Sequence, residues 1–233
     1  MKIDNLGMLL QQGNRAKAYL QNLAKNNLLP NHALLIINPG TPESLDTTPE
    51  GVDKSLYDPS ILETQTLERY GISYELIEGN SCNDSLVVEK LKNRPEEYFA
   101  FAGFGILKEV FNAGKKLIHV HPGKLPDYRG STCHHYSTVA EGKWYCAAFI
   151  MKPGVDEGDL ILQREFPIPR KEIDSARIYD PYTRSETLVS VVNQLAGTGG
   201  IKTTSQDLSK GASFYINHPL IHYMAWRIFQ NQN

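Results

Sequence analysis

Cysteine is scarce in this sequence. Only three cysteines occur, and they lie far apart at Cys82, Cys133 and Cys146. An odd number at this spacing provides neither a disulfide framework nor a CxxC metal-binding pattern, which excludes the small disulfide-rich class of protein. Unpaired cysteines are typical of a reducing compartment, so we expect the chain to be cytoplasmic.

Long apolar runs are missing as well. No stretch reaches the length of about 20 residues that a membrane-spanning helix needs, and the first residues lack a signal-peptide pattern. The formal net charge is −2, so the chain has no excess of positive charge that would suit a general binder of nucleic acid. With 233 residues the chain is long enough for one sizeable α/β domain with appendages.

Short apolar runs alternate with helical patterns through much of the chain. We predict buried strands at 33–37, 73–77, 98–102 and 115–118, helices at 60–70 and 84–91, and a hairpin from 144–151 and 160–166. The alternation of strand and helix predicts an α/β fold with a mostly parallel twisted sheet flanked by helices.

Both ends of the chain are predicted to be helical. Apolar residues recur at helical spacing near the start, so residues 1–30 are expected to form an N-terminal helical extension. Residues 31–175 then form the central α/β domain. Residues 176–233 form a short C-terminal extension, with a helix from 182 or 185 to 195 and a second at the end. This extension is expected to pack on the core or on a sister subunit of a homodimer.

The stretch from 118 to 130 organises the predicted domain. His119 and His121 are two residues apart, so on a strand both side chains point to the same face. Pro122 ends the strand, because proline cannot donate to a central ladder. Open α/β sheets bind their ligands at the carboxyl ends of strands, which makes both histidines candidate site residues. The alternative is that each is a structural histidine with satisfied hydrogen bonds.

A second stretch favours the functional interpretation. Asp156 lies in a turn flanked by Gly154 and Gly158, just before an apolar run. A carboxylate beside a histidine fixes its tautomer and favours its charged form. We therefore expect Asp156 to act on one of the two histidines if the fold brings them together.

Three pieces of this sequence resemble the folate-dependent formyltransferase family, which includes glycinamide ribonucleotide, methionyl-tRNA and sugar-nucleotide N-formyltransferases. They are HxHPGxLPxYRGS from His119 to Ser131, GVDEGDLIL from Gly154 to Leu162, and AGFGIL from Ala102 to Leu107. The resemblance covers residues 95–170 and rests on the combination of pieces. It implies the Rossmann-like formyltransferase fold and N10-formyltetrahydrofolate as the formyl donor.

The resemblance also implies roles for single residues. His121 would transfer protons and Asp156 would orient it. His119 stands where the family has an asparagine that donates a hydrogen bond to the formyl oxygen, and an imidazole can donate as well. The segment that resembles the lining of the pterin pocket would bind the pterin edge through its main chain; it comprises Gly103, Phe104, Gly105, Ile106 and Leu107.

The acceptor is predicted by elimination. Arg129 and His134 are expected to contact it, whereas zinc is not predicted, because the histidines lack a closed ligand set. Two prolines at 39 and 42, after the first expected strand, disfavour a phosphate-binding turn and hence glycinamide ribonucleotide. The tail is short and not basic, which disfavours tRNA. Among the acceptors of the family, this leaves a small molecule, an amine on a nucleotide-linked sugar.

Two other functions stay open. In a formyltetrahydrofolate hydrolase, water would replace the amine. In a catalytically inactive folate- or nucleotide-binding protein, the change to His119 would mark the loss of catalysis. The segment from 42 to 59 is expected to be a long loop that either contacts the acceptor or lies on the surface.

Overall fold

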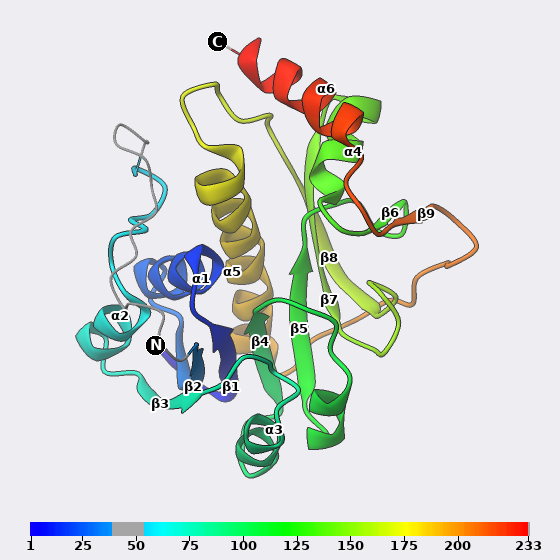
Figure 1. Cartoon of the computed structure of the whole chain (residues 1–233). Helices are drawn as coiled ribbons and strands as arrows, with labels where there is room; N and C mark the ends of the chain where they lie inside the picture. The colour runs from blue at the N-terminus through cyan, green and yellow to red at the C-terminus, as the bar shows by residue number, and fades with distance from the viewer. Residues whose placement is uncertain (39–53, 233) are drawn as a thin grey trace.

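A seven-stranded sheet forms the centre of the computed structural model, which describes residues 1–38 and 54–232 (Figure 1). The strands lie in the order β3-β2-β1-β4-β5-β7-β8. Their bounds are β1 Lys2–Gln11, β2 Leu29–Ile37, β3 Ser73–Glu78, β4 Tyr98–Ala102, β5 Lys116–His121, β7 Trp144–Ile150 and β8 Asp159–Phe166. The first five are parallel to their neighbours, and β7 and β8 are antiparallel. The predicted mostly parallel sheet is confirmed, and so is the hairpin at its edge.

The prediction for the N-terminus is wrong over its first part. Residues Lys2–Gln11 form β1, which lies between β2 and β4 in the middle of the sheet. Leu6, Met8 and Leu10 are fully buried, because a central parallel strand is covered on both faces, and its covered part is an apolar run. Such a run matches a helical stripe as well as a strand. Only Asn14–Lys25, α1, is helical, so the expected extension over 1–30 contains a strand of the central sheet.

The remaining helices cover the two faces of the sheet and the C-terminal part. They are α2 Glu63–Arg69, α3 Ser85–Lys92, α4 Cys133–Glu141, α5 Asp180–Thr198 and α6 Pro219–Gln230, with a 3-10 turn η1 at Glu109–Ala113 and a π-helical turn η2 at Ser175–Tyr179. The helix expected from 182 or 185 begins earlier, at Asp180, because Pro181 is well suited to the first turn of a helix.

Each face of the sheet has its own apolar core. On one face Leu6, Met8 and Leu10 of β1 pack in one cluster with apolar residues of α1 and α5. On the other, Leu9 belongs to a cluster that contains apolar residues of α3 and η1. Because alternate residues of a strand point to opposite faces, one strand serves both cores. This arrangement places α1 and α5 side by side on the same face of the sheet (Figure 1).

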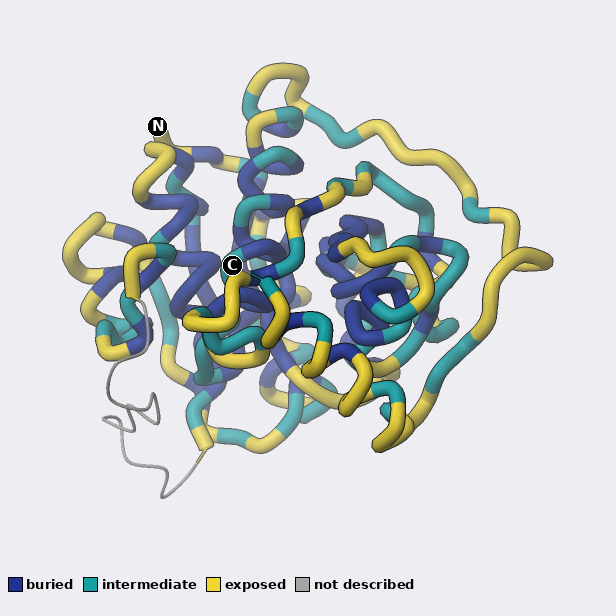
Figure 2. The backbone as a smooth tube through the Cα atoms, turned by 90° about the horizontal axis from the view of Figure 1, so that it is seen from above, coloured by how far each residue is buried: buried dark blue, intermediate teal, exposed yellow. Residues whose placement is uncertain are grey.

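A segment near the C-terminus returns to the hairpin and the loop after β5. Residues 204–217, here named the C-terminal strap, are mostly exposed and run along the outside of the molecule (Figure 2). Within the strap, β9 (Ala212–Phe214) pairs in parallel with β6 (Tyr128–Gly130). The helix α6 then packs on α4. In the described part of the chain no helix is long and apolar enough to cross a membrane. Most of the loop expected at 42–59 lies outside the described residues.

Candidate active site

His119 and His121 line the same pocket at the carboxyl end of β5, as the spacing of two residues predicts. The pocket has a volume of about 540 Å³ and is bounded by the ends of β4 and β5, the turn before β8, and residues of α1 and α5. Asp156, His134 and the segment from Gly103 to Leu107 line it too. The fold therefore brings together every candidate site residue except Arg129.

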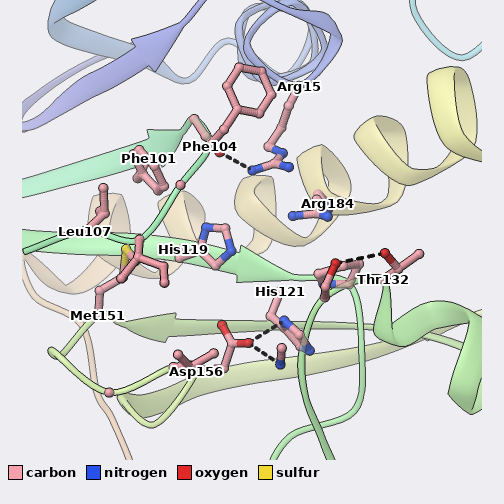
Figure 3. A pocket seen from close by; sticks show the side chains of 18 of the residues that line it. Arg15, Phe101, Phe104, Leu107, His119, His121, Thr132, Met151, Asp156 and Arg184 are labelled. Atoms are coloured by element: carbon pink, nitrogen blue, oxygen red, sulfur yellow. Dashed lines mark hydrogen bonds and ion pairs between the residues drawn. The ribbon is translucent and has the colours of Figure 1, made fainter. Parts of the chain in front are cut away.

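His121 has an acceptor at each ring nitrogen. Its Nδ1 lies 3.2 Å from Oδ2 of Asp156 (Figure 3), and its Nε2 lies 2.8 Å from the carbonyl oxygen of Tyr128. Only the charged imidazolium can donate to both partners. Burial lowers the pKa of His121, whose exposed fraction is 1%, whereas the charge of Asp156 and the hydrogen bond to Tyr128 oppose this shift. Burial therefore favours the neutral ring, and the two contacts reduce the free-energy cost of adding a second proton.

The glycine after Pro122 is a steric requirement of this arrangement. A Cβ atom on Gly123 would lie 2.7 Å from Nε2 of His121 and 2.7 Å from Cβ of Cys133. Both distances are shorter than atoms of this kind tolerate, so only glycine lets the loop pass between the imidazole and the start of α4.

The loop that holds His121 is itself held by the C-terminal strap. The backbone N–H of Gly130 donates to Oδ2 of Asp156 over 2.7 Å, so β6 contacts both members of the pair. Gly130 has a φ of 105°, and a Cβ there would lie 2.2 Å from the carbonyl oxygen of Phe214 in the strap. From the other side, Gln206 of the strap donates to the carbonyl oxygen of Asp156 over 2.9 Å. The strap therefore bridges the two segments that supply the pair.

Arg129 joins β6 to the strap and does not line the pocket. Its Nη1 donates to the carbonyl oxygens of Pro126 and Lys210 over 3.0 and 2.9 Å, and its Nε lies 3.4 Å from Oγ of Ser213. Its exposed fraction is 7%. The structure thus places this arginine away from the acceptor contact that we expected from the sequence. The groups of β6 that face the site belong to the backbone, the C=O of Tyr128 and the N–H of Gly130, whereas the side chain of Arg129 extends toward the strap.

His119 lies between apolar and cationic surroundings. Its ring is 5.7 Å from the ring of Phe101 and 5.6 Å from that of Phe149. Its Nδ1 is buried and has no hydrogen-bond partner in the described part of the chain. Burial, and then the nearby charges of Arg15 and Arg184, lower the pKa of His119 well below its ordinary value. His119 is therefore a neutral imidazole with one N–H to donate.

The segment from Gly103 to Leu107 has part of its main chain already engaged. The carbonyl of Gly103 accepts from Arg15 over 2.9 Å, the N–H of Phe104 donates to Gln11 over 2.6 Å, and the carbonyl of Ile106 accepts from Asn83. Gly105 and Leu107 make no main-chain hydrogen bond to any residue that the structure describes. Their groups are the ones left to bind an incoming polar edge.

Apolar side chains surround those free groups. Phe101, Leu107 and Met151 lie together on one side of His119 (Figure 3). A flat aromatic group would bury its faces against them. This part of the pocket therefore suits the pterin ring that the resemblance implies.

A family model for formyl transferase matches residues 8–192, the greater part of the chain. The protein belongs to the formyl transferase family. The resemblance drawn from the three sequence motifs is thereby confirmed. The match begins inside β1, which agrees with a first strand that lies in the sheet.

Curated relatives in this family are methionyl-tRNA formyltransferases. That of Clostridium acetobutylicum is 29% identical over 130 residues, which cover 53% of this chain and 41% of the relative. That of Syntrophus aciditrophicus is 30% identical over 154 residues, which cover 62% of this chain and 47% of the relative. The chain thus spans less than half the length of these two relatives.

Solved structures of formyltransferases share the fold. The N-formyltransferase from Helicobacter canadensis, in complex with folinic acid and dTDP-3-aminofucose, superposes with a TM-score of 0.60 at 18% identity, covering 97% of this chain and 80% of that one. Glycinamide ribonucleotide transformylase 1 from Symbiobacterium toebii gives 0.56 at 15% identity, covering 88% and 95%. WlaRD, a sugar 3N-formyl transferase determined in the presence of dTDP and 5-N-formyl-THF, gives 0.59 at 17%, covering 97% and 79%. At these identities the likeness concerns the fold.

Three charged residues of this formyl transferase site were missed by the sequence analysis. Arg15 lies in the first turn of α1, and Asp180 and Arg184 lie one turn apart in α5. Arg184 donates through Nε to Asp180 over 2.9 Å and through Nη1 to the carbonyl of Val120 over 3.0 Å. An acid and a base four residues apart on one helix is the pattern that could have indicated an ion pair.

The adjacent histidines of α4 have different partners, although their ring centroids lie 4.3 Å apart. His134 lines the pocket, and its ring stacks on that of Trp144 with centroids 4.3 Å apart. His135 instead lies 2.9 Å from Nδ2 of Asn217, near His222 of α6. Burial lowers the pKa of His134 to about 3 and that of His135 to about 4. Within the described ranges no group of three or more potential ligands could hold a metal ion.

Proposed function

We propose that the protein transfers a formyl group from N10-formyltetrahydrofolate to the amine of a small molecule, a nucleotide-linked amino sugar. The observation that carries this proposal is the contact between His121 and Asp156 in a pocket at the end of β5, within a formyl transferase domain. A carboxylate that orients a histidine is the arrangement that general acid–base catalysis requires.

In this reaction the acceptor nitrogen bonds to the formyl carbon, the bond from that carbon to N10 of the donor breaks, and the proton lost by the amine ends on N10. His121 carries that proton, and Asp156 stabilises the imidazolium that forms. To reach the reacting group, Nε2 of His121 must leave its contact with the carbonyl oxygen of Tyr128. The N–H of neutral His119 donates to the formyl oxygen as negative charge develops there.

The amino-sugar acceptor is supported by two structural relatives that were solved with dTDP or a dTDP-linked amino sugar. The prolines after residues 33–37 do not count against glycinamide ribonucleotide. The first strand is β1, and the turn after it contains Gly13. Glycinamide ribonucleotide therefore belongs in any panel of acceptors.

The test is a panel of amines incubated with N10-formyltetrahydrofolate and followed by mass spectrometry. The panel holds dTDP- and UDP-linked amino sugars, glycinamide ribonucleotide and a buffer blank. We expect one formyl group to be added to an amino sugar by the parent protein. His222→Ala serves as a matched control, because this exposed histidine of α6 lies outside the pocket.

Two results would contradict formyl transfer. Release of formate at the same rate with and without every amine indicates a formyltetrahydrofolate hydrolase. Tight binding of the folate without any turnover indicates an inactive binding protein.

A further inference from the structure

Asp156 has a backbone conformation that residues with a side chain rarely adopt. Its φ is 56°, which lies in the left-handed region. The Cβ atom makes this region unfavourable for most residues, although aspartate tolerates it better than others do. Such a conformation persists only where the surrounding structure holds it. The position of the Asp156 carboxylate beside His121 therefore depends on what holds the backbone of this turn.

One side chain of the C-terminal strap binds this turn at two points. Gln206 donates from Nε2 to the carbonyl oxygen of Asp156 over 2.9 Å and to that of Gly158 over 2.6 Å. A carbonyl oxygen only accepts, so turning the amide round would bring its Oε1 against both oxygens. Oε1 is buried and has no partner among the residues that the structure describes. The two donor contacts therefore determine how the amide is oriented.

The neighbouring backbone fixes both the glutamine and the turn. The strap residues on either side of Gln206 are exposed, whereas Gln206 itself is half-buried. Two backbone hydrogen bonds of 2.8 Å join Thr204 to Leu160 of β8, and they fasten the strap two residues before the glutamine. A Cβ on Gly158 would overlap the carbonyl oxygen of Ile150, so the turn also lies in close contact with the end of β7. The turn is thus confined between the hairpin and the strap.

We propose that Gln206 is a positioning residue, which fixes the backbone of Asp156 so that its carboxylate reaches Nδ1 of His121. Gln206 does not line the pocket, so it acts through Asp156. A hydrogen bond to a carboxylate is stronger than one to a carbonyl, so the aimed carboxylate favours the neutral ring with its proton on Nδ1. Nε2 can then accept the proton of the attacking amine. The inference rests on the proposed function and adds to it a residue outside all three sequence motifs.

The first test determines the tautomer of His121 in the protein without substrates. NMR spectra of the ring nitrogens at neutral pH distinguish a protonated nitrogen from an unprotonated one, and His121→Ala assigns the signals by their loss. In the parent we expect the proton on Nδ1. Gln206→Met has a similar length but no donor. In this variant we expect the proton to move toward Nε2, because the contact with the carbonyl oxygen of Tyr128 remains.

The second test measures the kinetics of formyl transfer. Gln206→Met should lower kcat at least about tenfold with little change in KM, because it displaces a group that acts on His121 and leaves the lining of the pocket in place. Burial lowers the pKa of His121 and the charge of Asp156 raises it. Displacement of the carboxylate therefore lowers this pKa further, and the limb of the pH–rate profile that belongs to His121 should move to lower pH.

A rescue variant and a matched control are available on the strap. Gln206→Asn keeps the amide on a shorter side chain, so it should recover part of kcat and of the Nδ1 tautomer, and it replaces Gln206→Met in both tests if that variant does not fold. Ser205 is the preceding residue, and its hydroxyl lies 3.3 Å from Oδ1 of Asp159, which also pairs with Lys152. Ser205→Ala should leave the tautomer and kcat unchanged.

The outcomes separate this inference from the proposed function. If Gln206→Met has a lower melting temperature but keeps the parent's tautomer, kcat and pH profile, the glutamine only stabilises the fold and the proposal is overturned. A parent ring protonated on Nε2 overturns it too. A tautomer that depends on Gln206, in a protein that formylates no amine of the panel, supports the positioning role and contradicts formyl transfer. Formyl transfer by Gln206→Met at the parent's rate contradicts the positioning role and supports formyl transfer.

Discussion

The two sides of the pocket differ in how completely their polar atoms are paired. Around His121 both ring nitrogens have acceptors, and Asp156 is held by the imidazole and by a backbone N–H. On the side of Arg15 and His119, Nε of Arg15 and Nδ1 of His119 are buried without partners in the described structure. An unpaired buried polar atom costs free energy, and a ligand that enters the pocket can supply the missing partners. We therefore expect the paired side to act in the reaction and the unpaired side to contact the ligand.

The paired side is also the one that depends on distant segments. The loop from Pro122 to Gly130 and the turn around Asp156 are both fastened by the C-terminal strap. Catalytic groups must be held close to their productive geometry, and segments that are well separated in the chain do this only when a third element ties them together. The comparison therefore predicts large effects on rate from the paired side and effects on substrate affinity from the other.

The largest effect is expected at the centre of the paired side. His121→Ala should lower kcat for formyl transfer by about 10²–10⁴, the usual contribution of a general acid–base group. Asp156→Asn should lose much of the activity, and the double variant should be no slower than His121→Ala, because the two side chains act as a unit. Steady-state rates of the three variants measure this. Near-normal turnover by His121→Ala would remove His121 from the mechanism.

The same experiment needs a check on folding. His121 is almost fully buried, so its loss leaves a cavity and unpairs Asp156. We expect a lower melting temperature in addition to the lower rate. A circular dichroism spectrum like that of the parent shows that the loss of rate is measured on folded protein.

The next effect is expected at His119, which belongs to the unpaired side but would touch the reacting oxygen. His119→Ala should lower kcat by about 10²–10³, as the loss of one oxyanion donor typically does. His119→Asn restores an N–H donor and should keep most of the activity or raise it. The measurement is kcat of the parent and of both variants, with the same formyl donor and the same acceptor. An alanine variant as fast as the parent would exclude His119 as the donor to the formyl oxygen.

A smaller effect is expected where the strap meets the loop. Arg129→Met removes the contacts to Pro126 and Lys210 but no atom of the pocket. It should lower kcat by about tenfold to a hundredfold with little change in KM, because it displaces the groups that hold His121 and Asp156. The pH–rate profile should shift as well, since the surroundings of His121 change.

Arg129→Lys provides the matched comparison for this prediction. It keeps one donor for the two carbonyl oxygens and should recover part of the rate. If Arg129→Met lowers thermal stability but leaves kcat and the pH profile unchanged, the arginine stabilises the fold without positioning the catalytic pair.

The smallest effect is expected on thermal stability when the pH is lowered, because the buried histidines of α4 are neutral in the folded protein. Burial lowers the pKa of His135 from 6.5 to about 4, and that of His134 to about 3. As pH falls below 6.5 the unfolded chain binds protons that the folded protein does not, so stability decreases with falling pH. Between about pH 7 and 5, above the range in which most carboxylates titrate, the melting temperature should fall.

Replacing one of these histidines should reduce the pH dependence. His135→Gln removes one of the buried histidines whose pKa is lowered, and it should make the fall of the melting temperature between pH 7 and 5 less steep. A parent protein whose melting temperature is the same at both pH values would show that these histidines are not held neutral by the fold.

Local sequence patterns were enough for a large part of the molecule. The strands at 73–77 and 98–102 and the hairpin that carries Asp156 follow from apolar runs and turn residues, which act over a few neighbouring positions. The histidines share one face because strand alternation decides it. The strand at Lys2–Gln11 could not be distinguished from a helix, since a short buried run satisfies both periodicities.

Other features depend on the order of strands in the sheet, which no short pattern encodes. Arg15 meets Arg184 only because β1 is central and because α1 and α5 cover the same face beside it. Arg129 points to the strap because β6 pairs with a strand more than 80 residues further along the chain. His121 and Asp156 could be proposed as a pair from their motifs, because local geometry determines where each residue lies on its own element. The position of Arg15 and Arg184 beside this pair depends on packing between distant segments, whose contacts form only when the whole sheet is in place.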